Sequence, residues 1–251
     1  MSKHTTPCAR LLQMDTPYIE FKPRKSLRDR ISIAAARLTQ SADAQLCAQL
    51  YCIRSRVARN IYLPKDLAAC EDGFPKALLR TDSLTHEVWP RRIRVAAAAE
   101  HTFEAYTSPV AILRNQKRQV IGQTIVHLLV DQHLNSLPLS ERQNLAATLQ
   151  AREAADPDWL KRLIHQHLGR TRFFWQLYPG LLSYRFKRLR QLTVARRLLC
   201  LPAAVAASCA CLVSSFLGYR SLKAGCTDYW PKAQRLGPTS LPHRVEMRPQ
   251  H

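Results

Sequence analysis

Residues 198–217 contain no charged side chain and read LLCLPAAVAASCACLVSSFL. Twenty residues of α-helix measure about 30 Å, the thickness of the hydrocarbon core of a bilayer. The stretch is rich in Ala, Ser and Cys, so its transfer into lipid is less favourable than that of a Leu-rich helix. A buried helix of a soluble domain is the alternative interpretation. We expect a transmembrane or deeply re-entrant helix over residues 198–219.

The charges on either side of this stretch favour the membrane. Six basic residues precede it and four follow it: Arg185, Lys187, Arg188, Arg190, Arg196 and Arg197, then Arg220, Lys223, Lys232 and Arg235. The flank of a membrane helix with more Lys and Arg usually stays in the cytoplasm. The part of the chain before the helix is therefore predicted to face the cytoplasm, at the inner (cytoplasmic) membrane of the cell. Aromatic residues and arginines alternate between residues 172 and 190, which is typical of a segment that lies against anionic headgroups.

The net charge of the chain requires an anionic partner. Its 251 residues contain 38 Lys and Arg against 18 Asp and Glu, and 46% of them are hydrophobic, which is typical of a folded protein and not of a disordered one. Nucleic acid, acidic lipid and phosphorylated substrates all fit such a charge. No nucleic-acid motif is present and the charge concentrates beside the apolar stretch, so membrane lipids are the expected partner. A soluble, basic nucleic-acid-binding protein is the least favoured alternative.

The eight cysteines indicate a cytosol-facing protein. None of them forms a CxxC pair, and no Cys or His cluster has the spacing of a zinc site. We therefore expect reduced, structural cysteines. Charged residues interrupt the first thirty positions, so no signal peptide is predicted there.

The pattern of the chain predicts a helix-rich α/β fold in five parts. These are a basic N-terminal segment (1–45), a folded region (46–136), a helical, basic interfacial region (137–197), the transmembrane helix (198–219) and a polar basic tail (220–251). Strands are expected at 46–54 and 91–99, and helices at 26–39, 55–62 and 108–134. The last of these helices is expected to carry an apolar stripe of Val110, Leu113, Val120, Ile121, Ile125, Leu128 and Leu129. Ser140 and Gln143 have the spacing of a capping box, and Asp156-Pro157 is expected to open a helix that ends at Gly169.

Five short motifs occur in a fixed order along the chain. They are QLYCIR (49–54), IYLP (61–64), EDGF (71–74), RNQKRQ (114–119) and YWPKAQR (229–235). In this order they resemble the second, acceptor-side half of the GT-A domain of membrane-bound family 2 glycosyltransferases, with its juxtamembrane tail. The resemblance covers residues 25–235, and each motif is weak when taken alone.

The resemblance implies an inverting transfer of a sugar from a nucleotide-sugar donor to a glycan or lipid-linked acceptor hydroxyl, at the cytoplasmic face of the membrane. Asp72 is then the general base, Glu71 orients it or binds the acceptor, and Gly73 leaves room for the acceptor. A positioned base typically contributes about 10²–10⁴-fold to a rate. An acidic pair that compensates a helix dipole is the alternative interpretation of Glu71 and Asp72.

Arg118 matches the arginine of the family's QxxRW-like motif, which implies that it holds the diphosphate; Gln116, Gln119 and Arg54 are further candidates for binding substrate. A guanidinium suits phosphate oxygens better than a lysine does. The sequence departs from the family because Gln119 stands where tryptophan is usual and Asn115 stands three residues before Arg118. The alternative interpretation of this motif is a solvated helix face formed by Arg114, Lys117 and Arg118.

The nucleotide-binding half of the family fold is not apparent. About 45 residues precede the 49–54 motif, too few for its strand–helix units of about 30 residues each. The complete fold implies Mg²⁺ or Mn²⁺, but no ligands are identifiable, since Asp156-Pro157-Asp158 is D-x-D only formally. We expect that the chain is a fragment of such an enzyme, a chain that needs a separate N-terminal half, or a degenerate member of the family. By itself it is expected to have little or no transferase activity. A non-catalytic membrane-associated scaffold is the alternative function.

Overall fold

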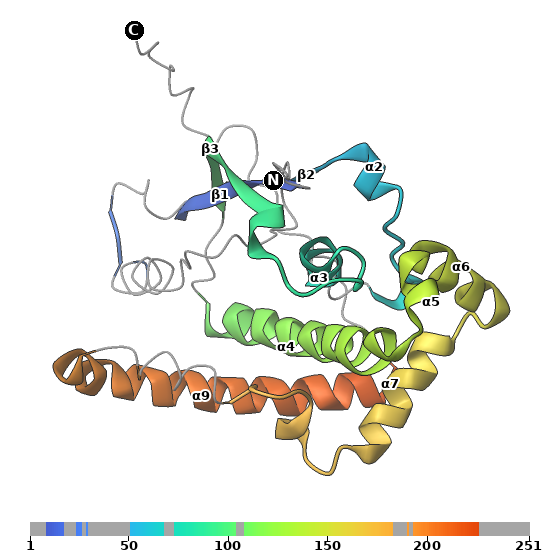
Figure 1. The fold of residues 1–251 in the computed structure, drawn as a ribbon. Helices are drawn as coiled ribbons and strands as arrows, with labels where there is room; N and C mark the ends of the chain where they lie inside the picture. Colours follow the sequence, from blue (N-terminus) through green and yellow to red (C-terminus); the bar gives the residue numbers. More distant parts are fainter. Residues whose placement is uncertain are drawn as a thin grey trace, which may run out of the picture.

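The computed structural model describes residues 9–17, 24–26, 29, 51–67, 73–103, 108–182, 190 and 193–225. Within these residues the chain is rich in helices, with a small sheet at one end (Figure 1). The predicted helix at 26–39, the first part of the predicted strand at 46–54, and both Glu71 and Asp72 lie outside the described residues, apart from Ser26 and Asp29.

The sheet consists of three strands in the order β2-β1-β3. β1 (Ala9–Pro17) pairs antiparallel with β2 (Tyr51–Ile53) and parallel with β3 (Ile93–Phe103). The strand predicted at 91–99 begins two residues later, because a 3₁₀ turn, η3 (Pro90–Arg92), occupies its start. A sheet of three strands is common to many folds, so it does not by itself assign the chain to the GT-A fold.

The hydrophobic core lies between the helices. α3 (Gly73–Thr81) packs on α4 (Pro109–Val126), which continues as a π-helix, η4 (His127–His133), and a 3₁₀ turn, η5 (Leu134–Ser136). α6 (Leu145–Ala155) and α7 (Trp159–Arg170) close the cluster. The apolar stripe predicted over 108–134 is confirmed at Val120, Ile121, Ile125, Leu128 and Leu129, which are all buried. It is wrong at the start of the helix, where Val110 is exposed and Leu113 is only half-buried.

Several predicted helix ends differ from the structure. α2 (Ser55–Ala58) is a single turn followed by the 3₁₀ turn η2 (Lys65–Leu67), so the helix predicted to 62 is too long. The capping box was wrong, because Pro138 holds the N-cap position of α5 (Leu139–Gln143) and no side chain caps that helix. α7 begins at Trp159, two residues later than predicted, with Asp158 in place of Asp156 as its N-cap. It also continues through Gly169 to Arg170.

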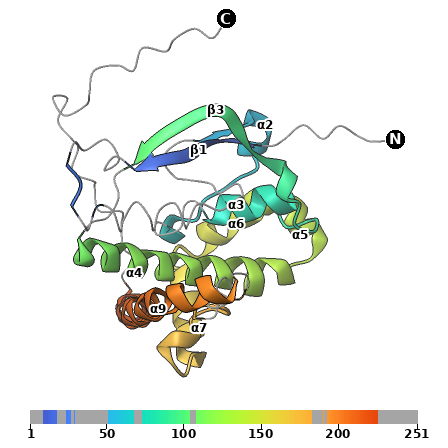
Figure 2. The same cartoon turned by 90° about the vertical axis from the view of Figure 1, so that its left-hand side faces the viewer.

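The uncharged stretch forms part of one long helix, α9 (Val194–Lys223). In Figures 1 and 2, α9 runs beside α4, on the side of α4 opposite to α3. Ser214 donates a hydrogen bond to the Leu113 carbonyl at 3.5 Å, and Gly218 lies against the Lys117 carbonyl. The two helices therefore run in the same direction, with position 210 level with Pro109. The part of α9 before 210 projects beyond the start of α4 (Figure 1).

Small residues allow α9 to approach α4 closely. A methyl group added at Gly218 would lie 3.4 Å from Cγ1 of Val120, 3.5 Å from Cγ1 of Ile121 and 3.7 Å from the Lys117 carbonyl oxygen. A β-carbon fits this space in ordinary contact, whereas the branches of a larger side chain would overlap α4.

We predict that Gly218→Leu destabilises the protein by about 1–3 kcal/mol through overpacking. Gly218→Ala should be neutral or stabilising by up to about 1 kcal/mol, because alanine favours a helix interior and its methyl group fits. Denaturation of both variants followed by circular dichroism measures these differences. Equal stability of the Leu and Ala variants would show that α9 does not pack on α4 in this way.

Candidate functional site

The residues singled out around the EDGF motif are placed only in part. Gly73 is the first residue of α3, so Glu71 and Asp72, which lie outside the described residues, directly precede that helix in sequence. Arg54 comes just before α2, where its carbonyl accepts hydrogen bonds from the backbone amides of Val57 and Ala58 at 2.8 and 2.9 Å. The prediction that the acidic pair stands at a helix start concerns residues outside the described part of the chain, so it stays a prediction.

The three candidates on α4 do not share one face. Gln116 and Arg118 are two residues apart, which places their side chains about 200° apart around the helix. Gln119 is exposed, whereas Arg118 and Gln116 are half-buried. The side-chain oxygen of Gln116 is buried and accepts no hydrogen bond within the described part of the chain. The side chains of Gln116 and Arg118 therefore leave α4 on different sides of the helix.

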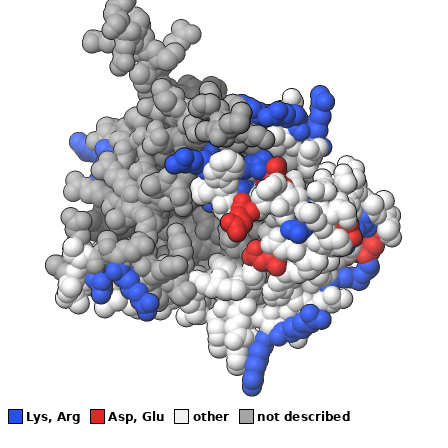
Figure 3. All heavy atoms as spheres, viewed as in Figure 1, with Lys and Arg blue, Asp and Glu red and all other residues white. Residues whose placement is uncertain are grey.

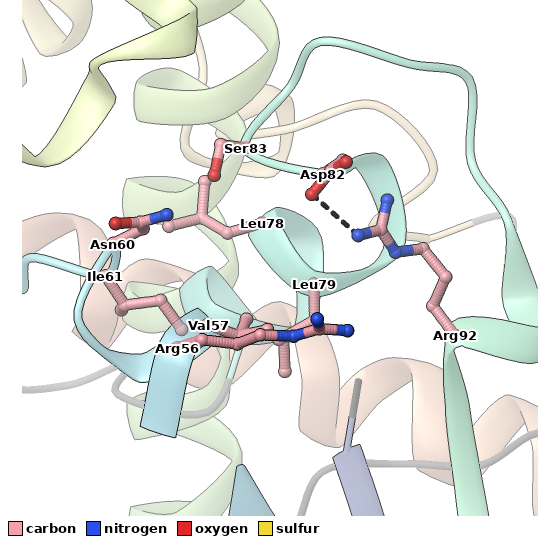
Figure 4. Close-up of a pocket in the computed structure, with 9 residues that line it drawn as sticks. All are labelled: Arg56, Val57, Asn60, Ile61, Leu78, Leu79, Asp82, Ser83 and Arg92. Carbon is pink, nitrogen blue, oxygen red and sulfur yellow. Dashed lines mark hydrogen bonds and ion pairs between the residues drawn. The ribbon is translucent and has the colours of Figure 1, made fainter. Parts of the chain in front are cut away.

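A cavity of 370 Å³ lies elsewhere, between α2, the C-terminal end of α3 and the start of β3 (Figure 4). Its polar lining comes from Arg56, Asn60, Asp82, Ser83 and Arg92. Its apolar lining comes from Val57, Ile61, Leu78 and Leu79. None of the candidate catalytic or substrate-binding residues lines it, although Ile61 of the IYLP motif does. Sequence reasoning missed this site because the lining comes from three segments that only the tertiary fold brings together.

An unusual turn forms one rim of the cavity. Asp82, Ser83 and Leu84 all have left-handed backbone conformations, with φ of 54°, 58° and 65°. This conformation costs an L-residue roughly 1–2 kcal/mol, and three in succession are rare. The sequence does not signal this turn, because α3 ends without the glycine that usually adopts a left-handed conformation after a helix.

Surrounding contacts hold the turn in place. The Leu84 side chain is buried and its amide donates to the Thr81 hydroxyl at 3.0 Å. Arg142 donates to the Leu84 carbonyl, and the Thr85 hydroxyl donates to the Asp82 carbonyl at 2.6 Å. The rim is therefore fixed by contacts from two helical segments and from the turn itself, as expected for a conformation that the isolated sequence would avoid.

Positively charged side chains outnumber negatively charged ones around the cavity. Arg92, whose side chain is 17% exposed, donates to Asp82 at 2.6 Å, and this hydrogen bond lowers the pKa of Asp82 while partial burial opposes the shift. The Arg56 guanidinium has no hydrogen-bond or ion-pair partner in the part of the chain that the structure describes. Basic side chains gather over the region of α2 on the face in Figure 3, with acidic ones beside them. The lining thus carries two guanidinium groups and one carboxylate.

The outer face of α9 is a second unusual surface. The side chains that face α4 and the core are mostly small and buried: Cys211, Ser214, Ser215 and Gly218, with Leu222. The opposite face exposes large apolar side chains at helical spacing: Val194, Leu198, Leu201, Val205, Val213 and Phe216. By length and composition, Ala204–Lys223 is apolar enough to cross a membrane, and only 22% of its most apolar window is buried. A core helix of a soluble domain would be mostly buried.

An aromatic cluster adjoins this outer face. In the loop after α7, which contains the 3₁₀ turn η6 (Phe174–Gln176), Phe173 stacks on Trp175 with ring centroids 4.5 Å apart. Phe174 contacts Phe216 of α9 edge to face at 5.5 Å. The guanidinium groups of Arg172 and Arg220 lie 5.4 and 5.9 Å from the rings of Phe173 and Phe216. Aromatic rings and arginines side by side are typical of a membrane–water interface.

No metal site emerges from the described residues, among which no three His, Cys, Asp or Glu side chains come together as ligands. The metal that the family resemblance implies is therefore assigned no ligands here.

The lowered pKa of Asp82 predicts a pH dependence of stability. The Asp82–Arg92 pair stabilises the fold fully above the ordinary pKa of 3.8, and this contribution is lost as the pH falls from there toward the lower pKa of the folded state. Asp82→Asn should therefore unfold at a lower temperature than the unsubstituted protein near neutral pH, with a difference that shrinks below about pH 4. Melting curves across this range test it, and a difference that is constant with pH would contradict it.

Comparisons with models of protein families, with curated proteins and with solved structures found no match to this chain.

Proposed function

We propose that this chain is a membrane-bound protein whose outer α9 face lies against lipid. The observation that carries this proposal is the reversed burial of α9, with small and hydroxyl-bearing side chains inside and large apolar ones outside. Helices in lipid pack through small residues, because no hydrophobic effect drives their large side chains inward. In water, such a continuous apolar face would promote aggregation or the binding of another protein.

The packing of α9 on α4 favours a helix in the plane of the membrane over one that crosses it. Between Arg197 and Cys211, the first described side chain of α9 that is buried, the helix is about 20 Å long, which is less than the bilayer core of about 30 Å. Beyond Cys211, the neighbouring helix α4 carries Arg114, Lys117 and Arg118. Each charged residue at the centre of a membrane costs about 2.5–3.5 kcal/mol. In the interfacial plane these groups stay near water.

Substitution of the outer face should release the protein from lipid. We predict that Leu198→Gln with Leu201→Gln lowers binding to vesicles that contain anionic lipid by at least about tenfold, because each leucine contributes about 1.5–3 kcal/mol when buried. Co-sedimentation with vesicles measures the partition coefficient.

A matched control exists in Leu63→Gln with Leu139→Gln. Both of these leucines are also exposed, at 44% and 50%, but they lie outside α9. The control pair should change binding less than about twofold. Equal losses for the two pairs, or no vesicle binding by the unsubstituted chain, would contradict the proposal.

As its activity, we propose the acceptor-side role in sugar transfer that the motif order implies. Two arrangements support it: Gly73 opens α3 directly after Glu71 and Asp72, and α3 packs on α4, which carries Arg118. A donor-binding half that holds the nucleotide sugar and its divalent metal would have to complete the site. The alternative, a membrane-associated scaffold without catalysis, uses the same surfaces but assigns no chemistry to Asp72.

The two alternatives predict different effects of replacing the Asp72 carboxylate by an amide. If Asp72 is the general base, Asp72→Asn in cells should lower the amount of glycosylated product by at least about a hundredfold, with an unchanged amount of the protein in the membrane fraction. Asp158→Asn, at an exposed carboxylate outside the motifs, is the matched control and should leave the product unchanged. Full product from the Asp72 variant would favour the scaffold.

A further inference from the structure

The geometry of the cavity beside α3 points to a ligand that involves neither the candidate catalytic and substrate-binding residues nor the membrane surface. We propose that this cavity binds a water-soluble small molecule through a phosphate group. The cavity has a polar rim, an apolar floor and a volume of 370 Å³, which is in the range of small-molecule sites. The proposal is independent of the sugar-transfer activity proposed above.

The rim supplies the donors that a phosphate requires. Arg56 comes from α2 and Arg92 from the segment that leads into β3, so two guanidinium groups flank the cavity from different elements (Figure 4). Within the described part of the chain, neither the Arg56 guanidinium nor the Asn60 amide has a hydrogen-bond partner. Guanidinium groups bind phosphate oxygens in pairs of parallel hydrogen bonds, and an amide or hydroxyl can donate to a third oxygen.

Asp82 has a positioning role at this site. Its carboxylate accepts from Arg92 at 2.6 Å and so fixes one guanidinium at the rim before any ligand arrives. The left-handed turn places Asp82 and the neighbouring Ser83 on the cavity, and contacts from Thr81, Thr85 and Arg142 hold that turn. Because the rim is fixed in advance, less conformational freedom is lost on binding. The carboxylate also repels an anion and neutralises part of the charge of Arg92. This repulsion outweighs the gain from the ordered rim, so the carboxylate limits the affinity for phosphate.

The position of the cavity indicates a soluble ligand and not a lipid headgroup. In both ribbon views, α4 lies between α3 and α9, so the cavity at the end of α3 is on the side of α4 opposite to the apolar face of α9 (Figures 1 and 2). A lipid phosphate held at α9 would not reach it. The apolar floor of Val57, Ile61, Leu78 and Leu79 suits the non-polar part of a small phosphate ester.

Calorimetric titration of the full chain with inorganic phosphate, against chloride at equal ionic strength, tests the site. We expect saturable binding that Arg56→Gln weakens by about tenfold or more, since hydrogen bonds to a charged group are lost. Arg59→Gln removes the same charge from the same short segment but lies outside the cavity lining, and should change the affinity less than about twofold.

A second variant gives a result that loss of folding cannot imitate. Asp82→Asn keeps a residue that tolerates the left-handed conformation but removes the negative charge, and should tighten phosphate binding by about threefold or more. Equal weakening by Arg56→Gln and Arg59→Gln, absence of saturation, or weaker binding by Asp82→Asn would overturn the proposal. So would a loss of binding to phosphatidic acid vesicles in Arg56→Gln without any effect on inorganic phosphate, because the ligand would then be a lipid.

Discussion

The close contact between α9 and α4 is the constraint on which the rest of this molecule depends. Gly218, Ser214 and Ser215 bring the two backbones together, and the same contact turns the large side chains of α9 outward. It also fixes how far α9 projects beyond α4, and it sets the charged residues of α4 beside the second half of α9. In the membrane-bound protein that we propose, this packing favours a helix that lies along the bilayer surface over one that crosses the bilayer.

The same arrangement divides the molecule into two sides. The outer face of α9 and the aromatic rings of Phe173 and Trp175 lie on one side of α4, and the cavity beside α3 lies on the other. A protein held at a membrane by the first side would present the second to the aqueous phase. The net charge of +20 is consistent with both proposed ligands, since anionic headgroups and soluble phosphates each attract it.

Sequence reasoning predicted the long elements and failed at their ends and at the cavity. Residues 198–217 and the stripe around Ile121 and Leu129 were recognisable, because a long run or a sustained period leaves few alternatives. The capping box at Ser140 failed because the helix has its N-cap at Pro138, two residues earlier than the motif requires. The rim of the cavity depends on three left-handed residues that tertiary contacts stabilise against their own preference, which no local pattern reveals. Arg118, chosen from its motif, is placed on α4, but its supposed partner Asp72 is outside the described residues.

The depth of α9 in a lipid bilayer tests the central claim most directly. Spin labels at positions 198, 205 and 213, one per variant, report their depth through the ratio of collision with oxygen to collision with a water-soluble nickel complex. A helix in the interfacial plane predicts three similar, shallow depths. Depths that change steadily along the helix would show that α9 crosses the membrane, and full exposure of all three labels to the nickel complex would show that this face does not contact lipid.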